Sequence, residues 1–291
     1  MKVGLMLAQS PGGGDGGSWS EISALARLAE EGGADSLWVS DHLLYRPGDG
    51  TEAGYHEAWT LLAALAATTS RVEIGALVLA TSFRPPGLLA RMTATLDDVA
   101  GGRLILGLGC GWHEPEYSAF GYPFDHRVGR FDEQLQVIVP LLRGERVTLD
   151  GRWTKVEDAV LLPPPRQPPT RVLVAAKGRR MLRLTARYAD LWQTAWFGLP
   201  DERWRQRRTD FLEACAVEGR DPAAVGVTVG VEVGSPPGDG PYAALRLDTT
   251  TIAEGLAAWR EEGVDHVQIA LAQATSATFA TCLEAIDRFR D

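Results

Sequence analysis

Cysteine is rare in this sequence of 291 residues, which contains only Cys110, Cys215 and Cys282. An odd number of widely spaced cysteines provides neither a disulfide framework nor a C-x-x-C metal site. A chain of this kind suits a reducing compartment, so we expect a cytoplasmic protein. The apolar stretch at residues 3–8 is too short for the hydrophobic part of a secretory signal peptide.

Long hydrophobic runs and an excess of basic residues are also missing. No apolar run approaches the roughly 18 residues that a membrane-spanning helix needs, so we expect no membrane partner. The 29 Lys and Arg residues are outnumbered by 38 Asp and Glu residues, which gives a net charge of −9. Because nonspecific nucleic-acid binding needs a basic surface, we expect no nucleic-acid partner and a small-molecule substrate.

Several catalytic motifs are absent as well. The five histidines form no H-x-H or H-E-x-x-H pair, and the chain has no G-x-S-x-G elbow and no Walker phosphate loop. Asp41-His42 and His56-Glu57 could meet at one edge of a barrel, as ligands do in metal-dependent hydrolases. Their spacing is not diagnostic, so this is a minor alternative and we expect no metal.

The dominant pattern of the chain is a short apolar run followed by an amphipathic helix. Runs of Val, Ile and Leu without strict alternation are typical of parallel strands covered on both faces. Eight such strands alternating with helices indicate a closed barrel or a doubly wound sheet, which periodicity alone does not separate. The predicted strands are residues 3–8, 36–40, 72–79, 103–108, 171–176, 190–194, 225–231 and 266–271.

One segment interrupts this pattern. Residues 144–170 contain a possible hairpin, with Asp150-Gly151 as its turn, and a proline-rich loop at 163–169. We interpret this segment as an insertion before strand five. No linker divides the chain, so we expect a single domain over residues 1–291.

Candidate functional residues follow the predicted strands, because chemistry in a TIM barrel occurs at the carboxyl ends of the strands. Strand two ends at Asp41 and His42, and an imidazole there could exchange a proton with a bound ring. The alternative is structural, with Asp41 capping a turn and His42 packed. Phe83 and Arg84, after strand three, either line a pocket or belong to an ordinary loop with a solvated arginine.

Two further strand ends have a composition that suits ligands. After strand four, Gly107, Gly109 and Gly111 alternate with other residues and allow a ligand close to the backbone. This is not the dinucleotide fingerprint, and such glycines can simply relieve crowding. After strand five, the segment 177–180 (KGRR) opens a helix, and a helix N-terminus with positive charge suits a phosphate.

These segments together resemble the luciferase-like monooxygenase and F420-dependent oxidoreductase superfamily. The strongest matches are ADSLWVSDHLL (34–44), the long segment at 71–121 that contains TSFRPP and GLGCGWHEPEY, and RRMLRLTARYADLWQT (179–194). Weaker matches lie at 129–135, 218–225 and 254–271. They span nearly the whole chain in the expected order, so the joint match is specific although each piece alone is not.

The resemblance implies a (β/α)8 TIM barrel, an α/β fold, with the insertion before strand five. It also implies a flavin or deazaflavin ring over the barrel mouth, with His42 as the catalytic acid or base. The implied cofactor-binding residues are Asp41, Leu77, Val78, Gly109, Cys110, Gly111, Trp112, Lys177, Gly178 and Arg179. Among them, Leu77-Val78 would be a non-prolyl cis peptide, and Gly178 and Arg179 would take the phosphate. Ala175-Ala176 replaces a Gly-Gly pair that many relatives have.

The implied activity is hydride transfer between the deazaflavin F420 and a small organic substrate. The alternative is an FMN-dependent monooxygenase that uses reduced flavin and oxygen, and a non-catalytic flavin-binding protein is a third possibility. The implied substrate pocket includes the 43–56 loop, Trp112, Trp196 and Phe197, and its aromatic walls favour an apolar or ring-bearing substrate. Relatives commonly dimerise, so we expect a homodimer.

Overall fold

The computed structural model describes residues 1–10, 17–48, 50–235 and 243–291. Within them, eight parallel strands form a closed barrel, because β10 pairs with both β11 and β7 and so joins the two ends of the sheet. The strands are β1 (Lys2–Met6), β2 (Ser36–Val39), β5 (Glu73–Ala76), β7 (Leu104–Gly109), β10 (Arg171–Ala175), β11 (Leu191–Phe197), β12 (Gly226–Val233) and β13 (His266–Leu271). The predicted (β/α)8 TIM barrel is confirmed, and each predicted strand is found within a few residues of its expected bounds.

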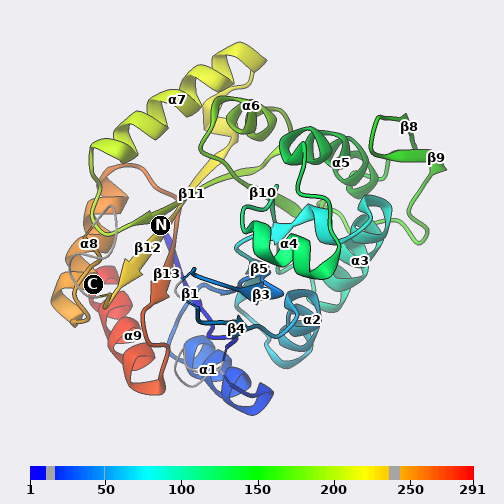
Figure 1. Cartoon of the computed structure of the whole chain (residues 1–291). Coiled ribbons are helices and arrows are strands. Elements are labelled where there is room, and N and C mark those ends of the chain that lie inside the picture. Colours follow the sequence, from blue (N-terminus) through cyan, green and yellow to red (C-terminus); the bar gives the residue numbers. More distant parts are fainter. Residues whose placement is uncertain (11–16, 49, 236–242) are drawn as a thin grey trace.

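Helices surround the barrel (Figure 1). They are α1 (Trp19–Glu31), α2 (Ala58–Thr68), α3 (Pro86–Val99), α4 (Glu114–Phe120), α5 (Arg127–Leu142), α6 (Arg179–Tyr188), α7 (Glu202–Glu218), α8 (Thr249–Glu261) and α9 (Ser276–Arg290). A capping box formed by Ser18 and Glu21 begins α1. No helix in the described parts of the chain is both long enough and apolar enough to cross a membrane.

A two-stranded hairpin lies within the segment at residues 144–170 that interrupts the sequence pattern. It pairs β8 (Val147–Asp150) with β9 (Lys155–Ala159) in an antiparallel arrangement. The turn spans residues 151–154, so the turn predicted at Asp150-Gly151 is displaced by one residue at its start. The reason is Glu133 of α5, whose carboxylate accepts backbone N–H groups from the turn, each at 2.8 Å, and so holds the longer loop. This hairpin precedes β10 and projects away from the barrel (Figure 1).

The barrel interior is filled by large side chains that enter where neighbouring strands carry glycine. A Cβ atom on Gly4 would lie 2.7 Å from the Trp38 indole, and one on Gly75 would lie 2.6 Å from it. Trp38 is fully buried and packs in one cluster with Met6 and Leu173. This cluster fills part of the barrel interior.

Candidate active site

A cavity of about 400 Å³ lies at the carboxyl ends of the barrel strands, where TIM-barrel active sites are found. All but one of the predicted catalytic and cofactor-binding residues line it: Asp41, His42, Leu77, Val78, Gly109, Cys110, Gly111, Trp112, Lys177 and Gly178. The exception is Arg179, whose side chain is exposed on the first turn of α6. Four strand ends far apart in the sequence therefore meet around one space.

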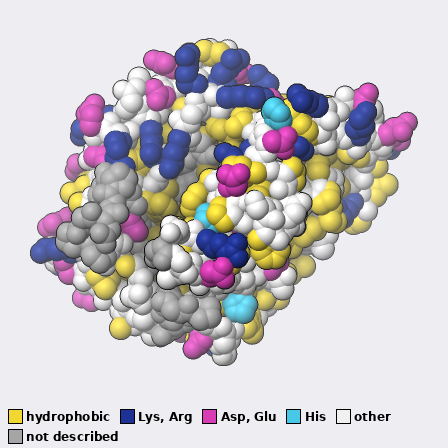
Figure 2. Space-filling view, in the orientation of Figure 1, with side chains coloured by type: hydrophobic (Ala, Val, Ile, Leu, Met, Phe, Trp, Pro, Cys, Tyr) yellow, Lys and Arg dark blue, Asp and Glu magenta, His cyan; other side chains and the backbone are white. Residues whose placement is uncertain are grey.

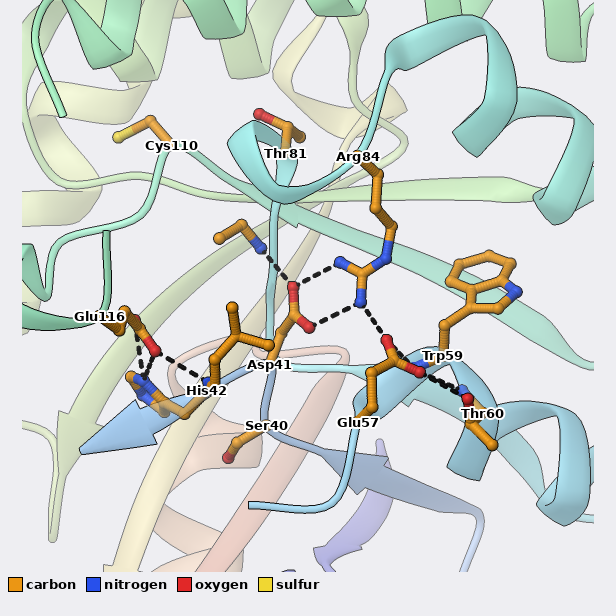
Figure 3. Close-up of polar contacts among 12 residues, drawn as sticks. Ser40, Asp41, His42, Glu57, Trp59, Thr60, Thr81, Arg84, Cys110 and Glu116 are labelled. Atoms are coloured by element: carbon orange, nitrogen blue, oxygen red, sulfur yellow. Dashed lines mark hydrogen bonds and ion pairs between the residues drawn. The ribbon is translucent and has the colours of Figure 1, made fainter. Parts of the chain in front are cut away.

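His42 is held by a carboxylate that the sequence analysis missed. Its Nδ1 atom lies 3.2 Å from Oε1 of Glu116, and Oε2 of Glu116 also accepts the backbone N–H of Leu43 at 2.9 Å (Figure 3). Glu116 is buried, with 3% of its side chain exposed, whereas 19% of the His42 side chain is exposed. Because carboxylate oxygens accept, Nδ1 is the nitrogen that carries a hydrogen, and Nε2 remains as the second functional atom of the ring.

Aromatic rings surround this imidazole. Tyr45, Tyr55 and Trp112 have ring centroids 5.6, 5.4 and 5.7 Å from that of His42. The Trp112 side chain is largely exposed, and Trp196 lines the same cavity from β11. The expectation that Phe197 lines the substrate pocket is wrong.

Phe197 is fully buried on the outer side of the barrel. Its ring lies 5.4 Å from that of Trp259, between the barrel and its helices. The lining of the cavity on β11 therefore ends at Trp196 and does not include Phe197.

The carboxylate of Asp41 accepts hydrogen bonds from other residues of the protein. Both of its oxygens accept from Arg84, at 2.8 and 2.9 Å, and one also accepts the backbone N–H of Ala80 at 2.9 Å. Arg84 bonds to Glu57 as well (Figure 3). Burial alone would lower the pKa of Arg84, but the Asp41 and Glu57 carboxylates raise it. Arg84 is therefore a buried cation rather than the solvated arginine of an ordinary loop.

The segment that follows β5 contains the predicted non-prolyl cis peptide at Leu77-Val78. A second one, which the sequence analysis did not predict, joins Ala195 to Trp196. Gly109 of β7 faces this segment, and a Cβ atom there would lie 2.6 Å from Cγ2 of Val78. The glycine therefore relieves crowding in addition to lining the cavity.

The other end of the cavity is basic. Gly178 is the N-cap of α6, and no side chain caps this helix, so its first N–H groups and its positive dipole end face outward. Lys177 lies beside it, and burial, together with nearby Arg207 and Arg203, lowers the pKa of its ammonium group. Figure 2 shows Lys and Arg side chains gathered along α6 and α7.

Arg207 reaches this end of the cavity from α7. Its Nη1 atom donates to Oγ1 of Thr194 at 2.8 Å and to the carbonyl of Ala195 at 2.9 Å, and both of these residues line the cavity. The sequence analysis did not single out Arg207, because nothing in the helix pattern relates it to strand β11.

These residues fit a flat, anionic cofactor. Leu77, Val78 and Trp196 provide apolar surface for a ring, and the uncapped start of α6 with Lys177 suits a phosphate. For a metal the fit is poor, because no group of three or more His, Cys, Asp or Glu side chains among the described residues is arranged to hold an ion.

A family model described as luciferase-like monooxygenase matches residues 1–247. The chain belongs to this family. It is 38% identical, over 174 residues, to an F420-dependent glucose-6-phosphate dehydrogenase of Beutenbergia cavernae, covering 58% of this chain and 51% of that one. The chain thus spans about half the length of that relative.

Two further relationships extend over more of the chain. A phthiodiolone/phenolphthiodiolone dimycocerosates ketoreductase of Mycobacterium tuberculosis is 32% identical over 257 residues, covering 80% of this chain and 67% of the relative. The structure of an F420-dependent secondary alcohol dehydrogenase in complex with an F420–acetone adduct has a TM-score of 0.82, with coverage of 100% of this chain and 99% of that one. At 18% identity, this last likeness shows the fold alone.

Proposed function

We propose that this protein is an F420-dependent oxidoreductase that transfers a hydride between F420 and a small organic substrate, and that residues 1–291 form one domain. The observation that carries the proposal is a single cavity with an imidazole at one end and an uncapped helix N-terminus with a lysine at the other. The F420-dependent dehydrogenase among its relatives supports this choice of cofactor.

The residues that would hold F420 divide between its ring and its phosphate. Leu77, Val78 and Trp196 would contact the ring, and Gly109 to Trp112 would border the chain that leaves it. Lys177 and the N-terminus of α6 at Gly178 would bind the phosphate. Arg179 stays a prediction as a phosphate ligand, since it does not line the cavity. When bound, F420 supplies two-electron hydride chemistry.

His42 would move the proton that accompanies the hydride. Nδ1 of His42 is hydrogen-bonded to Glu116, so Nε2 is the atom that would face a substrate oxygen. In oxidation of an alcohol, neutral Nε2 takes the hydroxyl proton while the hydride leaves carbon. In reduction of a carbonyl, the protonated ring gives the proton back to oxygen. Tyr45, Tyr55 and Trp112 around the imidazole favour an apolar or ring-bearing substrate.

A second candidate function is FMN-dependent monooxygenation, which the description of the family supports. The same cavity would take the FMN ring and phosphate. Oxygen consumption with reduced FMN and a substrate separates this activity from hydride transfer. A homodimer in the cytoplasm, as expected from the sequence, stays a prediction under either function.

A paired fluorescence titration of the purified chain with F420 and with FMN tests the proposal. We expect tight binding of F420 and weak binding of FMN. Tight binding of FMN alone would support the monooxygenase instead. Binding of neither would contradict the assignment of this cavity to a cofactor.

A further inference from the structure

Gln193 is a buried amide on the inner wall of the candidate active site. It belongs to β11, where it lies beside Ala175 of β10 and Thr228 of β12. Its side chain is 1% exposed, yet the residue lines the cavity. Gln193 precedes Ala195 by two residues on β11, so it lies farther from the carboxyl end of the strand and deeper in the barrel.

The orientation of this amide is fixed by one hydrogen bond. Oε1 of Gln193 accepts from the hydroxyl of Thr228 at 3.0 Å, and Thr228 is itself fully buried. Nε2 of Gln193 then has no hydrogen-bond partner among the described residues. Buried amide groups in native proteins almost always have a partner, so this donor points to a bound group that brings an acceptor.

We propose that Nε2 of Gln193 donates a hydrogen bond to a carbonyl oxygen on the pyrimidine edge of the cofactor ring. The inference rests on the proposed function, because it requires a flavin-type ring in the cavity. It holds for F420 and for FMN alike, since both rings carry this edge. A phosphate has charged partners at Lys177 and α6, whereas Gln193 is a neutral amide beside Ala175 in the cavity wall and suits a neutral carbonyl.

This hydrogen bond affects the two redox states of the ring unequally. A reduced ring carries more negative charge on its pyrimidine oxygens than an oxidised one, and hydrogen bonds to charged acceptors are the stronger kind. Gln193 therefore strengthens binding of the reduced cofactor more than binding of the oxidised cofactor. Its role is to bind the cofactor and to set the relative affinity for its two redox states, while His42 transfers the proton.

The test compares four forms of the full-length chain: wild type, Gln193→Met, Gln193→Glu and Gln268→Met. Methionine keeps the length of glutamine but has no donor. Gln268 is the matched control, because its amide is also buried without a partner but does not line the cavity. Kd is measured by fluorescence for oxidised and for anaerobically reduced F420, with FMN in parallel, and thermal unfolding is followed without cofactor.

For Gln193→Met we expect Kd to rise about fivefold for the oxidised cofactor and about tenfold or more for the reduced one. Gln193→Glu should weaken the reduced form further, because a carboxylate repels the added charge. Gln268→Met should leave both Kd values unchanged. Unchanged binding by Gln193→Met, or binding restored by Gln193→Glu, would overturn the proposal.

A lower unfolding temperature of Gln193→Met with unaltered Kd values would also overturn it, since the role of Gln193 would then be structural. If the proposed function is wrong, the result is different. In that case the wild type and both variants at position 193 bind neither F420 nor FMN.

Discussion

The imidazole of His42 lies against the carboxylate of Glu116, with 3.2 Å between Nδ1 and Oε1, although 74 residues separate them in the chain. The contact connects the end of β2 to the first turn of α4. It leaves one defined nitrogen of the ring for chemistry, and Glu116 thereby becomes a positioning residue for His42.

Replacing Glu116 with Gln should lower kcat by about 10- to 1,000-fold, because an amide can present N–H to Nδ1 and favour the wrong tautomer. Cofactor affinity should change by less than a few-fold. The measurement is kcat across a pH series, where a positioning role alters the profile as well as the maximum. Glu114→Gln, on the exposed side of the same helical turn, is the control and should behave as wild type. A uniform loss of kcat with an unaltered pH profile would speak against positioning.

Replacing His42 with Ala should slow turnover by roughly 10²- to 10⁴-fold, the usual contribution of a general acid or base. Kd for the cofactor should stay within a few-fold of wild type. Steady-state kinetics combined with the fluorescence titration separate these two quantities. His126→Ala, which removes a half-exposed imidazole at the start of α5, controls for loss of a histidine as such. Unchanged turnover in His42→Ala would remove this residue from the mechanism.

The barrel and most of its cavity could be predicted, because each follows from local patterns. Runs of Val, Ile and Leu define the strands, and the fold then brings their carboxyl ends together. Arg207 of α7, which reaches the cavity, could not be singled out from the sequence, because charged residues separate the buried Trp204 and Phe211 and leave this helix without a clear apolar pattern.

Long-range contacts could not be predicted in this way. No local pattern relates Glu116 to His42, since only the tertiary fold places α4 beside the segment that follows β2. For Arg84, the sequence left a solvated side chain and a pocket residue equally open. Its two carboxylate partners are remote in the chain: Asp41 follows β2, and Glu57 is the N-cap of α2. Strand alternation alone could not exclude Phe197, because the consecutive residues Thr194, Ala195 and Trp196 all line the cavity and the register of β11 shifts between Thr194 and Phe197.

Replacing Arg84 with Met should reduce the free energy of unfolding by about 3–5 kcal/mol, because Asp41 would remain buried without its cation. Urea unfolding at neutral pH measures this change. The control is Arg46→Met. Its pair with Glu52 is exposed, and such pairs contribute about 1 kcal/mol at most. Equal effects of the two substitutions would mean that the Asp41–Arg84 pair contributes no more than a surface contact.

Removing positive charge from the basic end of the cavity should weaken binding of phosphate-bearing cofactors. Lys177→Met should raise Kd for F420 or FMN about tenfold, and Arg179→Ala should raise it by less, since Arg179 is exposed and does not line the cavity. Binding of riboflavin, which has the ring without the phosphate, should stay unchanged. Arg152→Ala on the distant hairpin is the control. If riboflavin affinity falls in parallel, Lys177 contacts the ring and the phosphate lies elsewhere.

Acid should destabilise this protein through His266, inside the barrel. Oγ of Ser36 receives a hydrogen bond from the Trp38 indole at 2.7 Å and lies at 2.8 Å from Nε2 of His266. Burial, then the charges of Lys2 and Arg171 and of the N-terminus, lower the pKa of His266 to about 3. The neutral ring is thus the folded form.

Since the folded pKa of His266 lies below the unfolded value of about 6.5, its stabilising effect is complete above pH 6.5 and is lost as the pH falls toward 3. Between pH 6.5 and 5 the loss should approach 1.4 kcal/mol per pH unit. Urea unfolding at both pH values, for wild type and for His266→Gln, measures it. The variant should lose most of this slope because glutamine does not titrate, whereas His126→Gln at the surface should keep it. An equal slope in wild type and His266→Gln would assign the acid sensitivity to other groups and would mean that the barrel tolerates a charged imidazole.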